Sequence, residues 1–289
     1  MPPRLQTAGS RAFSIGSSRG PLQFIFPTVD NEPKTMNRSP LLQESSQSHL
    51  LAPHRDFDWM GNRKHAKTAP HHLATAAHAF FAPMHYEDGY AYPLIVWIHC
   101  ANSNEEELHQ AMPLVSTRNY VAVAPRGTLD SKTVPGAFTW GQSSSDLAEA
   151  NERVRDCIHL AKDRYHVHPE RIYIAGHAAG GTMAHRIGME NPELFAGAIS
   201  LGGPVPRGGC PMRNIKQARK LPLMLAVSPQ ADNYSNEKVM DDLRLLHYAG
   251  FSLALRLYPE GDQLTTTMLS DVNTWIMESF CPSSTTVPS

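Results

Sequence analysis

Cysteine, net charge and long apolar runs are all scarce in this chain of 289 residues. Its four cysteines include no C-x-x-C pair, which argues against a disulfide framework or a structural zinc site and favours free thiols in a reducing compartment. No uninterrupted apolar run approaches the ~18–20 residues that a transmembrane helix needs. A formal net charge of -1 gives no electrostatic attraction to nucleic acid or to an anionic membrane. We therefore expect a soluble, cytoplasmic protein with no membrane span and no nucleic acid partner.

The first 71 residues also lack a sustained apolar pattern. From residue 1 to about residue 53 the chain is rich in Ser, Pro, Gln and Arg, a composition that buries too little apolar surface to offset the entropy of ordering. We predict a disordered or extended tail over residues 1–71, a folded domain over 72–281 and a disordered C-terminal tail over 282–289. Residues 1–29 contain arginines and serines but no acid, as organelle transit peptides do. The interpretation we favour is a true start downstream, with Met36 as the candidate.

From about residue 72, short apolar runs alternate with longer amphipathic stretches, the pattern of βαβ units and a parallel sheet. We expect an opening antiparallel hairpin around residues 79–89. The predicted strands then cover 93–99, 120–124, 171–175, 197–201, 223–227 and 252–258. The predicted helices cover 105–112, 146–166, the segment ending near 191, 236–248 and 265–280. The predicted fold class is α/β, a doubly wound and mostly parallel sheet with helices on both faces.

The stretch from Arg171 to Gly181 is the most informative part of the sequence. It predicts a buried strand, a sharp turn and a helix, the layout of the G-x-S-x-G nucleophile elbow. The outer glycines of that motif are present as Gly176 and Gly180, but Ala178 stands where the serine would be. A methyl group cannot attack an ester.

With this elbow, the strand 93–99 and the order of elements at the C-terminus, the chain resembles a known family over about residues 79–280. It is similar to α/β-hydrolases of the phospholipase/carboxylesterase and polyhydroxyalkanoate-depolymerase type. In that family the triad runs serine, acid, histidine along the chain, and one oxyanion donor follows the third strand. The resemblance places Ala178 at the serine, Asp232 at the acid and Asp262 at the histidine position.

Two of the three triad positions therefore hold residues that are unsuited to act as the nucleophile and the general base. An exposed aspartate, with a pKa near 3.9, is a much weaker base than an imidazole near 6.5. Loss of the nucleophile alone costs ~10⁶ in kcat in a serine protease. The expected oxyanion loop, from His99 to Ser103, also lacks the glycines usual in the family. The backbone N–H of Ala179 is expected to remain as one donor.

The resemblance and these losses predict a catalytically degenerate protein that binds a small ester-like or acyl compound, or a partner, without hydrolysing it. One alternative is an active ester hydrolase in which Cys100 and His177 form a rearranged site. Another is a purely structural interaction protein whose pocket has closed. A metal site built from His99, His177, Asp232 and Asp262 is disfavoured because no close-spaced ligand pair is present. We predict no metal and no cofactor. The residues expected to border the pocket are His99, Cys100, Ala101, His177 and Ala179.

Overall fold

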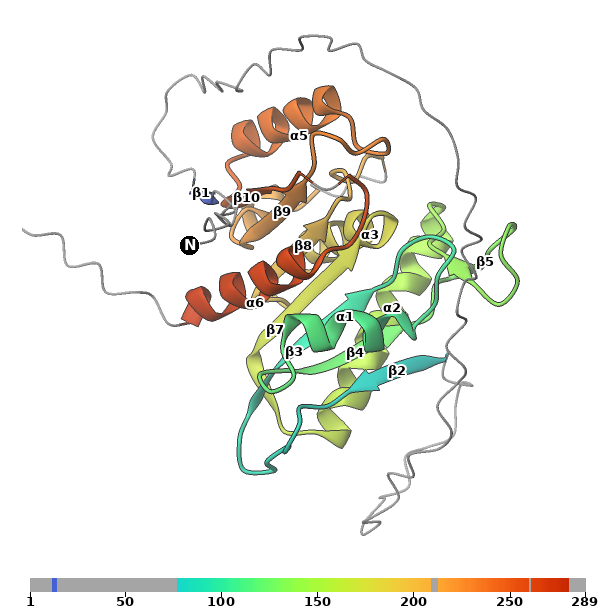
Figure 1. Cartoon of the computed structure of the whole chain (residues 1–289), viewed down its shortest axis with the longest axis vertical. Helices are drawn as coiled ribbons and strands as arrows, with labels where there is room; N and C mark the ends of the chain where they lie inside the picture. The colour runs from blue at the N-terminus through green and yellow to red at the C-terminus, as the bar shows by residue number, and fades with distance from the viewer. Residues whose placement is uncertain (1–11, 15–76, 209–212, 260, 281–289) are drawn as a thin grey trace, which may run out of the picture. The chain divides into compact units, whose positions relative to one another are not determined.

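The computed structural model describes residues 12–14, 77–208, 213–259 and 261–280. Its main sheet has eight strands in the order β1-β10-β9-β8-β7-β3-β4-β2 (Figure 1). Neighbouring strands run parallel except at the two edges, where β1 and β2 are antiparallel to their partners. A separate two-stranded sheet joins β5 to β6.

The bounds of the elements agree closely with the sequence pattern. The strands are β1 (Ala12–Ser14), β2 (His78–Phe81), β3 (Tyr92–Ile98), β4 (Val121–Pro125), β5 (Leu129–Asp130), β6 (Phe138–Thr139), β7 (Val167–His177), β8 (Gly197–Leu201), β9 (Leu223–Val227) and β10 (Leu253–Leu257). The helices are α1 (Glu107–Val115), α2 (Ser144–Arg164), α3 (Ala179–Glu190), α4 (Ile215–Ala218), α5 (Asn236–Ala249) and α6 (Thr266–Phe280).

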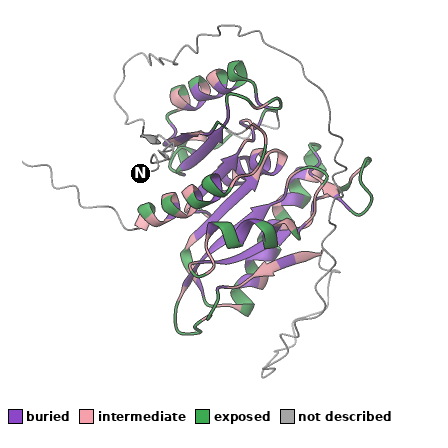
Figure 2. Ribbon diagram, in the orientation of Figure 1, coloured by how far each residue is buried: buried purple, intermediate pink, exposed green. Residues whose placement is uncertain are grey.

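Helices cover both faces of the sheet, as predicted. Along β3, Leu94, Val96 and Ile98 enter one hydrophobic cluster with α2, α3 and α5. The alternate residues Ile95 and Trp97 enter a second cluster with α1 and α6. Successive side chains of a strand point to opposite faces, so a fully apolar strand needs cover on both sides. Figure 2 shows the central strands buried and the outer faces of the helices exposed.

Local sequence signals set several helix ends. Ser143 and Asp146 form a capping box at the start of α2, which accounts for the serine run there. Helix α3 ends at Glu190, and its C-cap Asn191 directly precedes Pro192, because a residue before proline avoids the helical conformation. Gly250 ends α5 in the left-handed conformation at φ 78°, as glycine readily does.

One prediction about strand pairing was wrong. We expected an opening antiparallel hairpin around residues 79–89, but β2 pairs with the more distant β4, and His78 lies opposite Pro125. An antiparallel edge strand has the same local pattern whichever neighbour it joins, so the sequence could not identify its partner. The short elements α4, β5 and β6 were not predicted.

The described residues include only residues 12–14 of the predicted N-terminal tail and none of the predicted C-terminal tail at 282–289. Residues 12–14 form β1, which pairs with β10 through the register Ala12 to Arg256. Apart from residues 12–14, the segment with the transit-peptide composition lies outside the described residues, and so does the candidate start at Met36. Within the described ranges, no helix combines the length and the apolar character required to cross a bilayer.

Candidate functional site

The turn between β7 and α3 has the strained backbone of a nucleophile elbow. Ala178 lies at φ 48° and ψ -115°, a region that residues with a side chain rarely occupy. Its backbone N–H donates to Leu201 O at 2.8 Å, which ties the turn to β8. The turn that would raise a serine above the sheet is therefore present, and it presents a methyl group.

Glycines allow this turn to pack against its neighbours. A Cβ on Gly180 would overlap the carbonyl oxygens of Ile98 and His99 at the end of β3, and one on Gly203 would overlap the carbonyl oxygen of Ala178. Backbone atoms cannot move aside as a flexible side chain can, so only glycine fits both positions. Close contact between α3 and β3 is thus the physical reason for the second glycine of the elbow motif.

The acid and histidine positions of the resemblance come together in space. Asp262 Oδ2 accepts hydrogen bonds from the backbone N–H of Asp232 and the side-chain amide of Asn233, each at 3.1 Å. The Asp262 carbonyl accepts one from His177 Nε2, also at 3.1 Å. These hydrogen bonds join the loops that carry Asp232 and Asp262 to the end of β7 at His177. Through its two accepted hydrogen bonds, the Asp262 carboxylate stabilises the loop that carries Asp232.

Cys100 lies just past the end of β3, beside the elbow, because Ile98 and Gly176 are register partners in the sheet. The backbone N–H of Cys100 donates to Glu107 Oε2 at 3.1 Å. The other carboxylate oxygen of Glu107 accepts from Trp97 Nε1 at 3.0 Å. One amide of the predicted oxyanion loop is therefore already bonded to a carboxylate of the chain itself.

The thiol of Cys100 is close to His177, as the alternative hydrolase requires. Ligand atoms of Cys100, Glu107 and His177 all lie within 4.8 Å of one another. Burial, and then the charge of Glu107, raise the pKa of the Cys100 thiol to about 12. A reactive cysteine needs a lowered pKa, because the thiolate is the nucleophile. The pair is assembled, but the thiol is held in its protonated form.

His99 holds the loop together and does not border an open pocket. It is fully buried; its Nε2 accepts from the N–H of Gly127 at 2.9 Å, and its Nδ1 donates to the carbonyl of Cys100 at 2.7 Å. Burial is the main cause that lowers the pKa of His99. We expected His99 to border the pocket. Its ring instead points into the protein, where its two hydrogen bonds hold two loops together.

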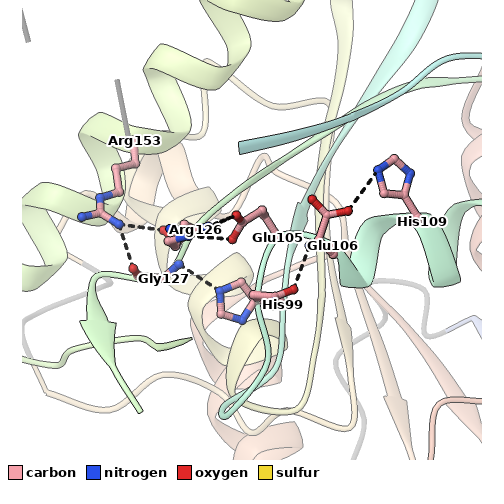
Figure 3. Close-up of polar contacts among 8 residues, drawn as sticks. His99, Glu105, Glu106, His109, Arg126, Gly127 and Arg153 are labelled. Carbon is pink, nitrogen blue, oxygen red and sulfur yellow. Dashed lines mark hydrogen bonds and ion pairs between the residues drawn. The ribbon is translucent and has the colours of Figure 1, made fainter. Parts of the chain in front are cut away.

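The same network continues to charged residues near His99 (Figure 3). Arg153 donates to the carbonyls of Arg126 and Gly127 at 2.9 and 2.7 Å. Arg126 forms an ion pair with the buried Glu105. Burial, the largest single cause, raises the pKa of Glu105, but the hydrogen bonds and charge of Arg126, together with a backbone hydrogen bond and the charge of His99, lower it below its ordinary value. This network stabilises the loops behind the site.

The space at this rim is small. A cavity of ≈ 10 Å³ is lined by His177, Gly202, Ser228, Tyr234, Asp262 and Met268 among others. That volume accommodates about one water molecule. Ala101 is exposed, whereas Ala179 is partly buried at the start of α3, where its N–H has no acceptor within the helix.

Glu107 is the residue of this site that the sequence analysis missed. The signal available was its place in the first turn of the helix after β3, which lies at the same edge of the sheet as the carboxyl end of that strand. Acidic residues in the first turn of a helix are already explained by the helix dipole, so they do not by themselves indicate a site. A single such position does not show which way the side chain points.

Comparison with solved structures defines the class of fold. The structure is similar to a carboxylesterase from Bacillus cereus at 18% identity and a TM-score of 0.57, over 72% of this chain and 96% of that one. It is similar to a carboxylesterase from Mesorhizobium loti at 14% identity and 0.55, over 64% and 88%. It is also similar to acyl-protein thioesterase 2 from Zea mays at 16% identity and 0.53, over 71% and 99%.

These likenesses and the sheet order together establish that the chain has the α/β-hydrolase fold. No protein-family model and no curated protein matches the sequence.

Proposed function

We propose that this protein is a catalytically degenerate member of the α/β-hydrolase fold, which binds a small acyl or ester-like compound or a partner without hydrolysing it. One observation carries the proposal: Ala178 occupies the strained position of the nucleophile at φ 48° and ψ -115°. Backbone strain of this kind costs about 1–3 kcal/mol and serves a hydrolase by exposing a reactive atom. Here the methyl group offers none.

Two further features support the loss of ester hydrolysis. The Cys100 N–H donates to Glu107, so this amide of the expected oxyanion loop is not free to stabilise the developing charge of a tetrahedral intermediate. The Asp262 carboxylate accepts two hydrogen bonds from the Asp232 loop and has no imidazole chemistry to offer.

The rearranged hydrolase with a Cys100 nucleophile is disfavoured. With a thiol pKa of about 12, roughly one thiol in 10⁵ is ionised at pH 7. A negative carboxylate beside the thiol also opposes the negative charge that an attacking sulfur carries.

A second candidate, an interaction protein whose pocket at this rim has closed, is favoured by the ≈ 10 Å³ cavity beside His177. Small-molecule sites are usually ≈ 300–1,000 Å³. A rise in melting temperature with acyl compounds would favour the ligand-binding protein. No rise across a broad panel would favour the interaction protein.

The test of the proposal is a hydrolase assay on the purified full-length chain. Short p-nitrophenyl esters and thioesters should show no turnover above the buffer rate, and a fluorophosphonate probe should not label the protein. An active carboxylesterase assayed in parallel sets the sensitivity. Turnover at an ordinary enzymatic rate, or covalent labelling, would overturn the proposed function.

A further inference from the structure

Three side chains of different chemistry converge beside the elbow. Cys100 follows β3, Glu107 opens α1 and His177 ends β7, and one ligand atom of each lies within 4.8 Å of the other two. Thiolate, carboxylate and imidazole are the three protein ligands of zinc. We propose that Cys100, Glu107 and His177 form a binding site for a zinc ion.

The distances suit zinc after a small closure. Zinc holds these ligand atoms at about 2.0–2.3 Å, which places them roughly 3.3–3.8 Å apart around a tetrahedral ion. From separations of up to 4.8 Å, each atom has to move by about 1 Å or less. Rotations of the three side chains supply movements of this size without a change in the sheet.

Neighbouring groups already orient two of the ligands. Glu107 accepts from Trp97 Nε1 at 3.0 Å and from the N–H of Cys100 at 3.1 Å; a carboxylate has about four lone-pair positions, so room for the ion remains. His177 donates its Nε2–H to the Asp262 carbonyl at 3.1 Å, which leaves the lone pair on Nδ1. Hydrogen bonds of this kind fix the tautomer and orientation of metal ligands.

The charge of the cluster also fits a cation. In the absence of one, Glu107 repels a thiolate at Cys100, in agreement with the raised pKa of that thiol. A zinc ion removes this repulsion, and the sulfur–zinc bond replaces the sulfur–hydrogen bond, so one proton leaves for each ion bound. The apparent affinity should therefore rise about tenfold per pH unit between pH 7 and 8.

The site is reachable and leaves one position open. Cys100 and His177 are partly exposed, and Ala101 beside them is exposed. With three protein ligands, the fourth tetrahedral position belongs to water or to a group of a bound molecule, as in catalytic rather than structural zinc sites. Thiolate favours zinc over the hard cations magnesium and calcium.

The experiment is a zinc titration of the full-length chain, first freed of metal with a chelator. Calorimetry with zinc chloride should give one tight site, with a Kd of about 1 µM or below. Cys100→Ala and His177→Ala should each weaken it by about 100-fold. The matched controls are Cys157→Ala, a buried thiol of α2, and His109→Ala, an exposed histidine of α1. Both should bind as the parent does.

Two measurements keep the test decisive. Cobalt(II) bound in place of zinc should give a sulfur-to-metal charge-transfer absorption that persists in Cys157→Ala and disappears in Cys100→Ser, a variant that preserves the volume. Glu107→Gln should weaken zinc binding, whereas Glu106→Gln, its exposed neighbour, should not.

The proposed site is overturned if the parent binds no zinc tighter than about 0.1 mM. It is equally overturned if tight binding survives both Cys100→Ala and His177→Ala, which would place the ion elsewhere in the chain. Ester turnover that appears only with zinc would support the metal site and overturn the proposed non-hydrolytic function, so the two proposals fail separately.

Discussion

Glu107 Oε2 accepts a hydrogen bond from the backbone nitrogen of Cys100 at 3.1 Å. This contact places the carboxylate of α1 on the loop that follows β3, beside the elbow. One amide of the expected oxyanion loop is therefore bonded to a carboxylate outside the three triad positions.

The contact predicts that restoring the triad alone will not restore an esterase. The double variant Ala178→Ser with Asp262→His should show little turnover of p-nitrophenyl acetate, because Glu107 still occupies the Cys100 amide. Adding Glu107→Ala frees that donor and should raise kcat by about 100-fold, the value of one oxyanion donor. Glu106→Ala added to the same double variant is the control. Equal activity of the double and triple variants would show that the Cys100 amide has no such role.

The close packing of the elbow predicts a large effect of one methyl group. Gly180→Ala should lower the free energy of unfolding by about 3 kcal/mol, because the new Cβ overlaps backbone carbonyls of β3. Gly89→Ala, where no atom lies within 4 Å of the added Cβ, should change it by no more than about 0.5 kcal/mol. Urea unfolding followed by circular dichroism measures both. A Gly180→Ala protein as stable as the parent would contradict this packing.

The strained turn predicts a stabilising substitution. Ala178→Gly should raise the free energy of unfolding by about 1 kcal/mol, since glycine adopts φ 48° without steric strain and the relief exceeds its extra chain entropy. Ala184→Gly, in the buried middle of α3, should instead lower it by about 1 kcal/mol or more. Thermal and urea unfolding compare the pair. A destabilised Ala178→Gly would mean that this backbone carries no strain.

Burial of His185 predicts a loss of stability in mild acid. This residue of α3 is fully buried, its Nε2–H donates to Met224 O at 3.1 Å, and burial lowers its pKa to about 4. In the unfolded chain a histidine has a pKa of about 6.5. Between pH 6.5 and 4 the unfolded chain therefore binds the proton and the folded chain does not. The free energy of unfolding should decrease by on the order of 3 kcal/mol as the pH is lowered through this range.

His185→Gln should flatten that dependence in urea unfolding between pH 4 and 7, and His109→Gln, an exposed histidine, should leave it unchanged. Burial also lowers the pKa of His99, so part of the pH dependence of stability should remain in His185→Gln. A slope identical to that of the parent would exclude His185 as its source.

The sequence predicted the fold well because its signals are local. A fully apolar strand such as Tyr92–Ile98 needs helices on both sides, and small residues at Gly176 and Gly180 mark one sharp turn. The resemblance then assigned Ala178, Asp232 and Asp262 to the triad positions, and a hydrogen bond joins the loops of the two aspartates.

The details of the site depended on the course of one loop. Nothing in the residue types showed that the His99 ring turns inward to Gly127 or that Glu107 turns back to Cys100. Both depend on contacts between segments separated in the chain, and a propensity or a motif does not contain them. The same limit applies to β2, whose partner β4 lies beyond its nearest neighbour in sequence.

The glycines around the elbow hold the backbone of residue 178 in place whatever side chain it carries. In the genetic code, one nucleotide change converts an alanine codon into a serine codon, and one converts an aspartate codon into a histidine codon. A mutational route to a serine and a histidine at these two positions is therefore short, because the turn that would present the serine is already folded. Glu107 makes that route longer, since the carboxylate would also have to leave the Cys100 amide.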